Sequence, residues 1–263
     1  MNMPDQRKPL TGDLFIMGFK RGAETYGKAL LGMIIFSIIA FAPIILILIF
    51  VALDDASFLP LTIIVAVLYL LAWPGVTGAF YKYFLWIARG EKPQLSEALR
   101  AGFQIEVWGK YMLLSLMFIG AFLVLFIPLV IGVAFESPAL AVMGGLLVFA
   151  GYVGIIYLGI ALLLVWPLII DRGMPLIESL KTSLSLVHWI GWWRIFLVYG
   201  CFYIMCTLPG GIVDAIYTFS VVMNSGEVPI FTPGYLFLPF TLPFLVMLIM
   251  NIYLAALKKL SNN

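Results

Sequence analysis

Apolar residues form six long runs along this chain, and shorter polar stretches separate them. The hydrocarbon core of a bilayer is about 30 Å thick, so a helix that crosses it needs roughly 20 residues. Each run is about that length or longer. The pattern therefore predicts an all-α integral membrane protein with six transmembrane helices, at residues 29–53, 58–88, 111–135, 138–170, 193–212 and 233–257.

The second and fourth predicted spans are longer than a bilayer requires. Each has about 30 residues, or about 45 Å as a continuous helix, so it must tilt, break or extend beyond the hydrocarbon. Near the end of the second span, Tyr81, Lys82 and Trp86 mix aromatic and charged side chains, as residues at a membrane interface do. We therefore expect these helices to extend into the cytoplasm.

Three glycines recur at a constant spacing, each where a polar stretch turns into an apolar run. Gly27, Gly109 and Gly191 are 82 residues apart, and an aromatic residue lies one or two positions before each of them. A fixed period of this kind predicts repeated structural units. We expect a single membrane domain over residues 1–263, built from three units at about 12–91, 92–173 and 174–260.

Each unit begins with a stretch that has the period of an amphipathic helix. Within residues 175–190 the apolar positions recur at steps of four, four and three, at Leu176, Leu180, Leu184 and Val187. Similar stretches occupy residues 13–26 and 93–108. Each unit is thus predicted to be a cytoplasmic interfacial helix followed by a helical hairpin through the membrane. Two spans per unit give all copies one orientation, with a pseudo-threefold axis along the membrane normal.

The composition supports a location in the bilayer. Hydrophobic residues make up 63% of the chain and charged residues only 11%, whereas a soluble domain has about 25% charged residues. So few charges cannot cover the surface of a soluble globular protein. The composition therefore excludes a cytosolic enzyme, a nucleic-acid-binding protein and a disulfide-rich secreted domain.

The basic residues are confined to one side of the predicted topology. All 15 Lys and Arg residues lie before the first span, in or next to the segments joining spans two to three and four to five, or at the C-terminus. The other three connecting segments carry only acids, which are Asp54, Asp55, Glu136, Asp214 and Glu227. Because Lys and Arg favour the cytoplasmic side of a membrane, we expect both termini to be cytoplasmic.

Catalytic and metal-binding patterns are not expected in this sequence. The chain contains one histidine, which excludes a His-cluster metal site, and we expect no cofactor. By the predicted boundaries, no ionisable residue lies deep in a span, where it would mark an ion path or a proton relay. Single acids such as Glu91, Glu106 and Asp171 are interpreted as solvated neighbours of basic residues.

Two sets of polar residues are hypotheses for functional sites. Basic residues around the predicted interfacial helices would bind anionic lipid or a protein partner, and they are Arg89, Lys92, Arg100, Arg172 and Lys181. Glu24, Glu106 and His188 each precede a repeat glycine by three residues. Pseudo-threefold packing would bring these three side chains together as a polar gate on the cytoplasmic face.

Two segments resemble a known group of membrane proteins. They read GVTGAFYKYFLWIARGEKPQLSEALRAGF and PLIIDRGMPLIESLKTSLSLV. The succession resembles a loose group of bacterial six-span inner-membrane proteins of unknown function that includes the YciC-like proteins. It is also similar to the membrane domain fused to some glycerophosphodiester phosphodiesterases. The resemblance implies a six-helix domain in the bacterial inner membrane, and it supplies no catalytic residues.

Two functions fit these expectations. The first is a non-enzymatic scaffold or accessory subunit whose basic cytoplasmic rim binds anionic membrane lipids or a protein partner. The alternative is a permease-like transporter subunit for a hydrophobic or lipid-like substrate, coupled to a separate ATPase. A cavity or lateral groove open to lipid would favour transport, whereas a closely packed bundle would favour the scaffold.

Overall fold

The computed structural model describes residues 11–53, 56–134, 138–225 and 238–260. Every element in these ranges is helical, as the sequence predicts. The elements are α1 (Thr11–Ala52), η1 (Ala56–Phe58), α2 (Leu59–Arg89), α3 (Leu95–Gly102), α4 (Ile105–Ala134), α5 (Pro138–Ala161), α6 (Val165–Arg172), α7 (Leu176–Ile190), α8 (Trp192–Ser225) and α9 (Leu238–Leu260). Four acids predicted for outer loops, Asp54, Asp55, Glu136 and Glu227, lie outside the described residues.

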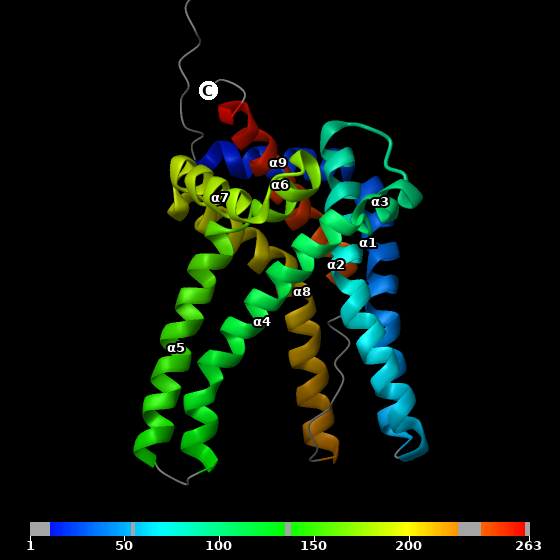
Figure 1. The fold of residues 1–263 in the computed structure, drawn as a ribbon, viewed down its shortest axis with the longest axis vertical. Coiled ribbons are helices and arrows are strands. Elements are labelled where there is room, and N and C mark those ends of the chain that lie inside the picture. The colour runs from blue at the N-terminus through cyan, green and yellow to red at the C-terminus, as the bar shows by residue number, and fades with distance from the viewer. Residues whose placement is uncertain (1–10, 54–55, 135–137, 226–237, 261–263) are drawn as a thin grey trace, which may run out of the picture.

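The helices form a packed cap from which long helical segments project (Figure 1). The cap consists of α3, α6, α7 and α9 together with residues 11–36 of α1, 74–89 of α2, 105–114 of α4 and 192–206 of α8. Buried side chains of these helices lie in these ranges, from Leu14 to Phe36 in α1 and from Ile195 to Cys206 in α8. The rest of α1, α2, α4 and α8 forms the projecting segments, together with α5 except for its buried end at Ile160 and Ala161.

Four helical segments are long and apolar enough to cross a membrane: Thr11–Phe50, Leu59–Arg89, Val142–Arg172 and Trp192–Met223. Their projecting parts expose large apolar side chains such as Ile45, Leu68, Phe149 and Phe219. In water such surfaces would favour aggregation, whereas lipid tails are as apolar as these side chains. The described chain therefore has helices suited to a membrane protein.

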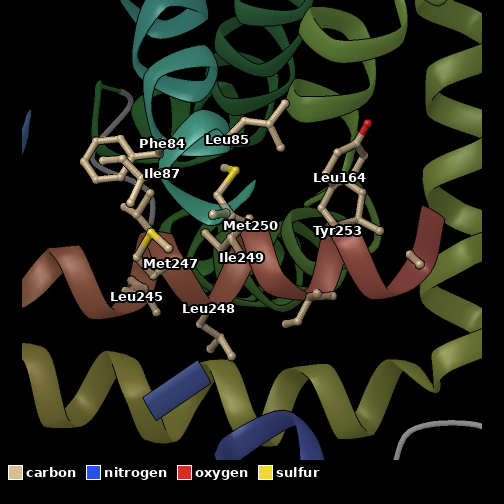
Figure 2. Packing of buried hydrophobic residues seen from close by; sticks show 14 of the residues in the cluster. Phe84, Leu85, Ile87, Leu164, Leu245, Met247, Leu248, Ile249, Met250 and Tyr253 are labelled. Atoms are coloured by element: carbon tan, nitrogen blue, oxygen red, sulfur yellow. The ribbon is translucent and has the colours of Figure 1, made fainter. Parts of the chain in front are cut away.

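The last helix lies in the centre of the cap. In α9 the side chains of Met247, Met250 and Tyr253 have no accessible surface, and Figure 2 shows α9 packing against Phe84 and Ile87 of α2. A helix that is apolar on all sides is stable when other helices surround it. The apolar part of α9, Pro243–Leu257, is shorter than the roughly 20 residues that a helix needs to cross a bilayer. Its burial makes it the core helix of the cap.

The predicted fourth span is not one continuous helix. Residues 162–164 form a turn between α5 and α6. Pro167, in the first turn of α6, has no backbone N–H and so cannot donate to the carbonyl of Leu163. The hydroxyl of Ser183 in α7 bridges this break: it donates to Ala161 O at 2.9 Å and accepts from the Leu164 N–H at 3.2 Å.

This bridge leads to a stability prediction for Ser183. Ser183→Ala leaves two buried backbone groups without their partner, and each such loss costs about 1–3 kcal/mol. We expect a clear fall in the melting temperature of the protein in detergent, measured by tryptophan fluorescence. Ser185→Ala changes an exposed serine on the same helix and should leave the melting temperature unchanged. Equal melting temperatures for the two variants would show that Ser183 does not hold the break.

The helix boundaries differ from those predicted from the repeat glycines. Gly27 lies inside the continuous helix α1 and Gly109 inside α4, so the first unit has no separate interfacial helix. Only Gly191 ends a helix, with a φ of 107° between α7 and α8. A single glycine costs a helix only about 1 kcal/mol, and helix-forming neighbours are therefore able to carry the helix through it.

The buried face of α7 is also different from the predicted apolar stripe. Leu184 is exposed, whereas Ser179, Ser183 and Leu186 are buried. The small serine side chains allow close approach and find hydrogen-bond acceptors, because Ser179 Oγ donates to Pro175 O at 3.0 Å. Hydropathy alone assigns such serines to the solvent side, so the predicted stripe was rotated from the observed one.

Candidate functional site

A buried carboxylate joins three helices of the cap. Asp171 Oδ2 accepts a hydrogen bond from Arg89 Nη2 at 2.7 Å and another from the Tyr253 hydroxyl at 2.6 Å. The Asp171 side chain is 5% exposed and that of Arg89 is 30% exposed. Hydrogen bonds to an ionised carboxylate are short and strong, so this cluster links α2, α6 and α9.

Helix ends position two members of the cluster. Arg89 is the last residue of α2, and Gly90 follows it with a φ of 78°. Asp171 lies in the last turn of α6, before Gly173 with a φ of 63°. Left-handed glycines of this kind end helices without the steric cost that other residues incur. The positive side chain of Arg89 also interacts favourably with the negative end of its own helix.

Both contacts of Asp171 join residues that are 82 positions apart in the chain. This is the spacing that separates Gly27, Gly109 and Gly191. The sequence interpretation placed Asp171 among solvated acids, and that interpretation is wrong because the carboxylate is buried between α2 and α9. Alignment of the three predicted units at this spacing puts Arg89, Asp171 and Tyr253 in one column, which is the signal that identifies the cluster.

The predicted polar gate is not assembled by the hydrogen bonds of the described chain. Glu24, Glu106 and His188 are each exposed, and among the described residues no hydrogen bond or ion pair joins any two of them. His188 instead contacts Tyr157, whose hydroxyl lies 3.2 Å from its Nε2, and Leu184, whose carbonyl oxygen lies 2.8 Å from its Nδ1.

The five predicted lipid- or partner-binding residues fall into two groups. Arg89 is held at the cap surface by its ion pair with Asp171, and its side chain is 30% exposed. The other four, Lys92, Arg100, Arg172 and Lys181, are exposed, although Arg172 Nε lies 4.0 Å from Asp171 Oδ2. These four exposed residues are called the basic rim below.

The outward face of α7 carries apolar and basic side chains together. Ile177, Lys181 and Leu184 occupy positions i, i+4 and i+7, which share one face of a helix. Ile177 is 68% exposed and Leu184 40% exposed. Phe103 and Ile105, between α3 and the first turn of α4, are exposed in the same way. Such mixed faces are typical of helices that lie in a membrane interface.

Two apolar hollows lie between helices where the cap meets the projecting segments. The first is a cavity of about 350 Å³ between α5 and α8, lined by Tyr152, Ile156, Gly159, Ile160, Leu163, Phe196, Tyr199, Gly200 and Tyr203. The second has a volume of about 310 Å³ and lies between α1 and α2, near Phe36 and Phe80. Cavities of this size are in the range of small-ligand sites.

One buried amide has an unused donor. Asn251 of α9 is 1% exposed, and its Oδ1 lies 3.4 Å from Nη1 of Arg21 in α1. Its Nδ2 has no hydrogen-bond partner in the described part of the chain. The amide thus joins two helices, as interhelical amides in membrane proteins do.

No family model, curated protein or solved structure matches the chain. Within the described ranges, no three His, Cys, Asp or Glu side chains lie where they could hold a metal ion. The function is therefore argued from the geometry of the cap, the basic rim and the two hollows.

Proposed function

We propose that the protein is a non-enzymatic scaffold of the bacterial inner membrane that binds anionic lipids through its basic rim. The outward face of α7 carries this proposal, because it exposes Lys181 between two apolar side chains, Ile177 and Leu184. Side chains of this kind insert into the acyl boundary while the ammonium group stays at the level of lipid phosphates. A protein partner on the same face is compatible with this role.

The proposal places the cap on the cytoplasmic side, with both termini there. The confinement of all 15 basic residues to one side of the predicted topology supports this orientation. We further propose that α4 is a fifth span, which its length of 30 residues supports. The sixth span stays a prediction, because Pro243–Leu257 of α9 is buried in the cap.

We also propose that the domain consists of three related units arranged around a pseudo-threefold axis. The two 82-residue contacts of Asp171, to Arg89 and to Tyr253, support this arrangement, since equivalent positions meet at such an axis. Helix packing supports it too: α3 packs on α2, α7 packs on α6, and α1 packs on α9. The first unit would thus pack against the third through α1 and α9, which completes the arrangement around the axis.

The rim would attract an anionic leaflet by about 1 kcal/mol for each basic residue near the surface. Exposed acids such as Glu97 and Glu178, on α3 and α7, reduce this attraction. The exposed apolar residues add affinity that does not depend on salt. The binding should therefore weaken, but not vanish, as ionic strength rises.

Neutralising the rim tests this function. We expect the triple variant Lys92→Gln, Arg100→Gln, Lys181→Gln to lose about 100-fold in affinity for phosphatidylglycerol, because three favourable charges of about 1 kcal/mol each are removed. Affinity is measured by titrating fluorescent lipid into the protein in mild detergent. The double variant Glu97→Gln, Glu178→Gln is the control, because it removes two negative charges. It should bind phosphatidylglycerol more tightly than the native protein does. Unchanged affinity in both variants would contradict the role of the rim.

The second candidate is a permease-like subunit for a hydrophobic substrate. The lateral hollow between α5 and α8 favours it, because such a substrate would enter from lipid. Purification in mild detergent separates the two candidates. Co-purification of an ATPase subunit would favour the transporter, and its absence together with retained anionic lipid would favour the scaffold.

A further inference from the structure

We propose that the hollow between α5 and α8 is a binding site for one anionic glycerophospholipid of the surrounding bilayer. One acyl chain would lie between the two helices, and the phosphate would lie at the outer face of α7. The proposal adds a defined lipid site to the basic rim. It requires that α5 and α8 lie in a membrane, and it does not depend on the scaffold role.

Two glycines create the hollow. Gly159 of α5 and Gly200 of α8 both line it, and a Cβ added to either residue would meet no atom within 4 Å. Glycines that serve helix packing behave differently: a Cβ on Gly102 would overlap the backbone of α2. Close packing therefore does not explain Gly159 and Gly200, and the space between their helices is open to an acyl chain.

The polar groups in the hollow match the glycerol region of a phospholipid. Tyr152, Tyr199 and Tyr203 line the space, and none of their hydroxyls is hydrogen-bonded to another described residue. A phenol hydroxyl in an apolar environment usually finds an acceptor. Hydrocarbon offers none, whereas the ester carbonyls of a glycerophospholipid offer two. A glycerophospholipid has ester carbonyls next to its acyl chains. It therefore matches both the apolar side chains and the tyrosine hydroxyls that line the hollow.

A chain of aromatic contacts connects the hollow with α7. The ring of Phe196, in the hollow, stacks on Trp192 at 5.1 Å, and Trp192 stacks on Tyr157 at 5.1 Å. The Trp192 Nε1–H also donates to Tyr157 O at 3.1 Å. The Tyr157 hydroxyl then lies 3.2 Å from His188 Nε2. A series of contacting side chains thus links the lining of the hollow to His188 on α7.

The charges at this end suit a phosphate. His188 and Lys181 lie on the same face of α7, seven residues and about 10 Å apart. Lys181 makes no ion pair with any described residue, although the exposed Glu178 is three residues away on the same helix. Trp193 is 68% exposed beside the turn at Gly191, as a tryptophan at the membrane interface is. Figure 1 shows α7 lying across the end from which α8 projects.

Photo-crosslinking tests the site directly. The purified protein in mild detergent is mixed with phosphatidylglycerol that carries a diazirine in one acyl chain, then irradiated and digested. We expect the label on residues 152–163 and 196–203. Filling the hollow by Gly159→Leu or Gly200→Leu should reduce this labelling by about tenfold, because the leucine occupies the space of the chain.

Matched glycines on the same helices provide the controls. Gly154 and Gly211 also have nothing within 4 Å of an added Cβ, and neither lines the hollow. Gly154→Leu and Gly211→Leu should leave the labelling unchanged. Equal labelling in all four variants, or uniform labelling of α1, α2, α5 and α8, would show annular lipid only and overturn the proposal.

The headgroup is tested separately. Lys181→Gln should reduce the preference of this site for phosphatidylglycerol over phosphatidylcholine by about fivefold, the effect of one charge near the surface. Lys28→Gln changes an exposed lysine of α1 that is not part of the rim and should leave that preference unchanged. An unchanged preference in Lys181→Gln would overturn the placement of the phosphate at α7. If the triple variant Lys92→Gln, Arg100→Gln, Lys181→Gln kept the lipid affinity of the native protein while the native protein gave the expected crosslinks, the scaffold function alone would be contradicted.

Discussion

Gly102→Ala is expected to lower the free energy of unfolding by at least about 2 kcal/mol, one of the largest effects of a single methyl group in this chain. A Cβ at this position would overlap Gly75 O and Ala79 N of α2. Neither atom is able to move without distorting a buried helix, because Gly75 and Ala79 are themselves buried. α3 would have to separate from α2, which is measurable as a loss of melting temperature in detergent.

The matched control for this prediction is Gly109→Ala. Gly109 lies in α4, and an added Cβ would meet nothing within 4 Å. Alanine is a better helix former than glycine by about 1 kcal/mol, so this variant should be as stable as the native protein or slightly more stable. If both variants lost the same stability, the close approach of α3 and α2 would not be the cause.

Asp171→Ala is expected to destabilise the cap by about 2–3 kcal/mol. The change removes the acceptor of Arg89 and of Tyr253 at once. Arg89 is partly exposed and is able to turn toward solvent, so the cost is below that of leaving a fully buried charge unpaired. Chemical unfolding in detergent, followed by tryptophan fluorescence, gives the free energy change.

Three further variants separate the parts of this cluster. Arg172→Ala removes a half-exposed side chain 4.0 Å from the carboxylate, and a pair of that kind contributes about 1 kcal/mol or less. Tyr253→Phe removes one hydrogen bond and should cost about 1–2 kcal/mol. The double variant Asp171→Ala, Tyr253→Phe should cost less than the sum of its single changes, because the two side chains share a contact. Strict additivity would mean that the hydrogen bond contributes nothing.

The cluster bears on the hypothesis of a gate at Glu24, Glu106 and His188, which stays a prediction. The 82-residue period suggested that equivalent positions meet, and the structure does bring one such column together. The equivalent positions that the structure brings together are Arg89, Asp171 and Tyr253. Arg89 and Asp171 lie in the last turns of α2 and α6, and Tyr253 lies within α9. The period by itself does not say which column faces the axis, since every residue of a unit has equivalents in the other two.

Helix boundaries show a similar division between what could and could not be predicted. The apolar run of the fifth predicted span suggested an end near Ile212, yet α8 continues through Asp214 to Ser225. One polar residue does not end a helix when its neighbours are good helix formers. A break was one of the alternatives for the fourth span, although extension into the cytoplasm was expected. Its place at 162–164 was not predictable, because the fourth run is uniformly apolar and Ser183 supplies the bridging hydroxyl from another helix.

The sequence by itself determined the helical class and the presence of apolar helices long enough to cross a membrane. The six-span topology, and with it the one-sided distribution of basic residues, stays a prediction. The helical class and the apolar helices follow from composition and from the periodicity of single helices. They depend only on whether each side chain prefers lipid or water. The tertiary structure decided that Asp171 is buried, that Ser183 and Gly102 face neighbouring helices, and that Gly159 and Gly200 leave a hollow. These outcomes depend on contacts between helices distant in the chain, and hydropathy contains no information about which faces meet.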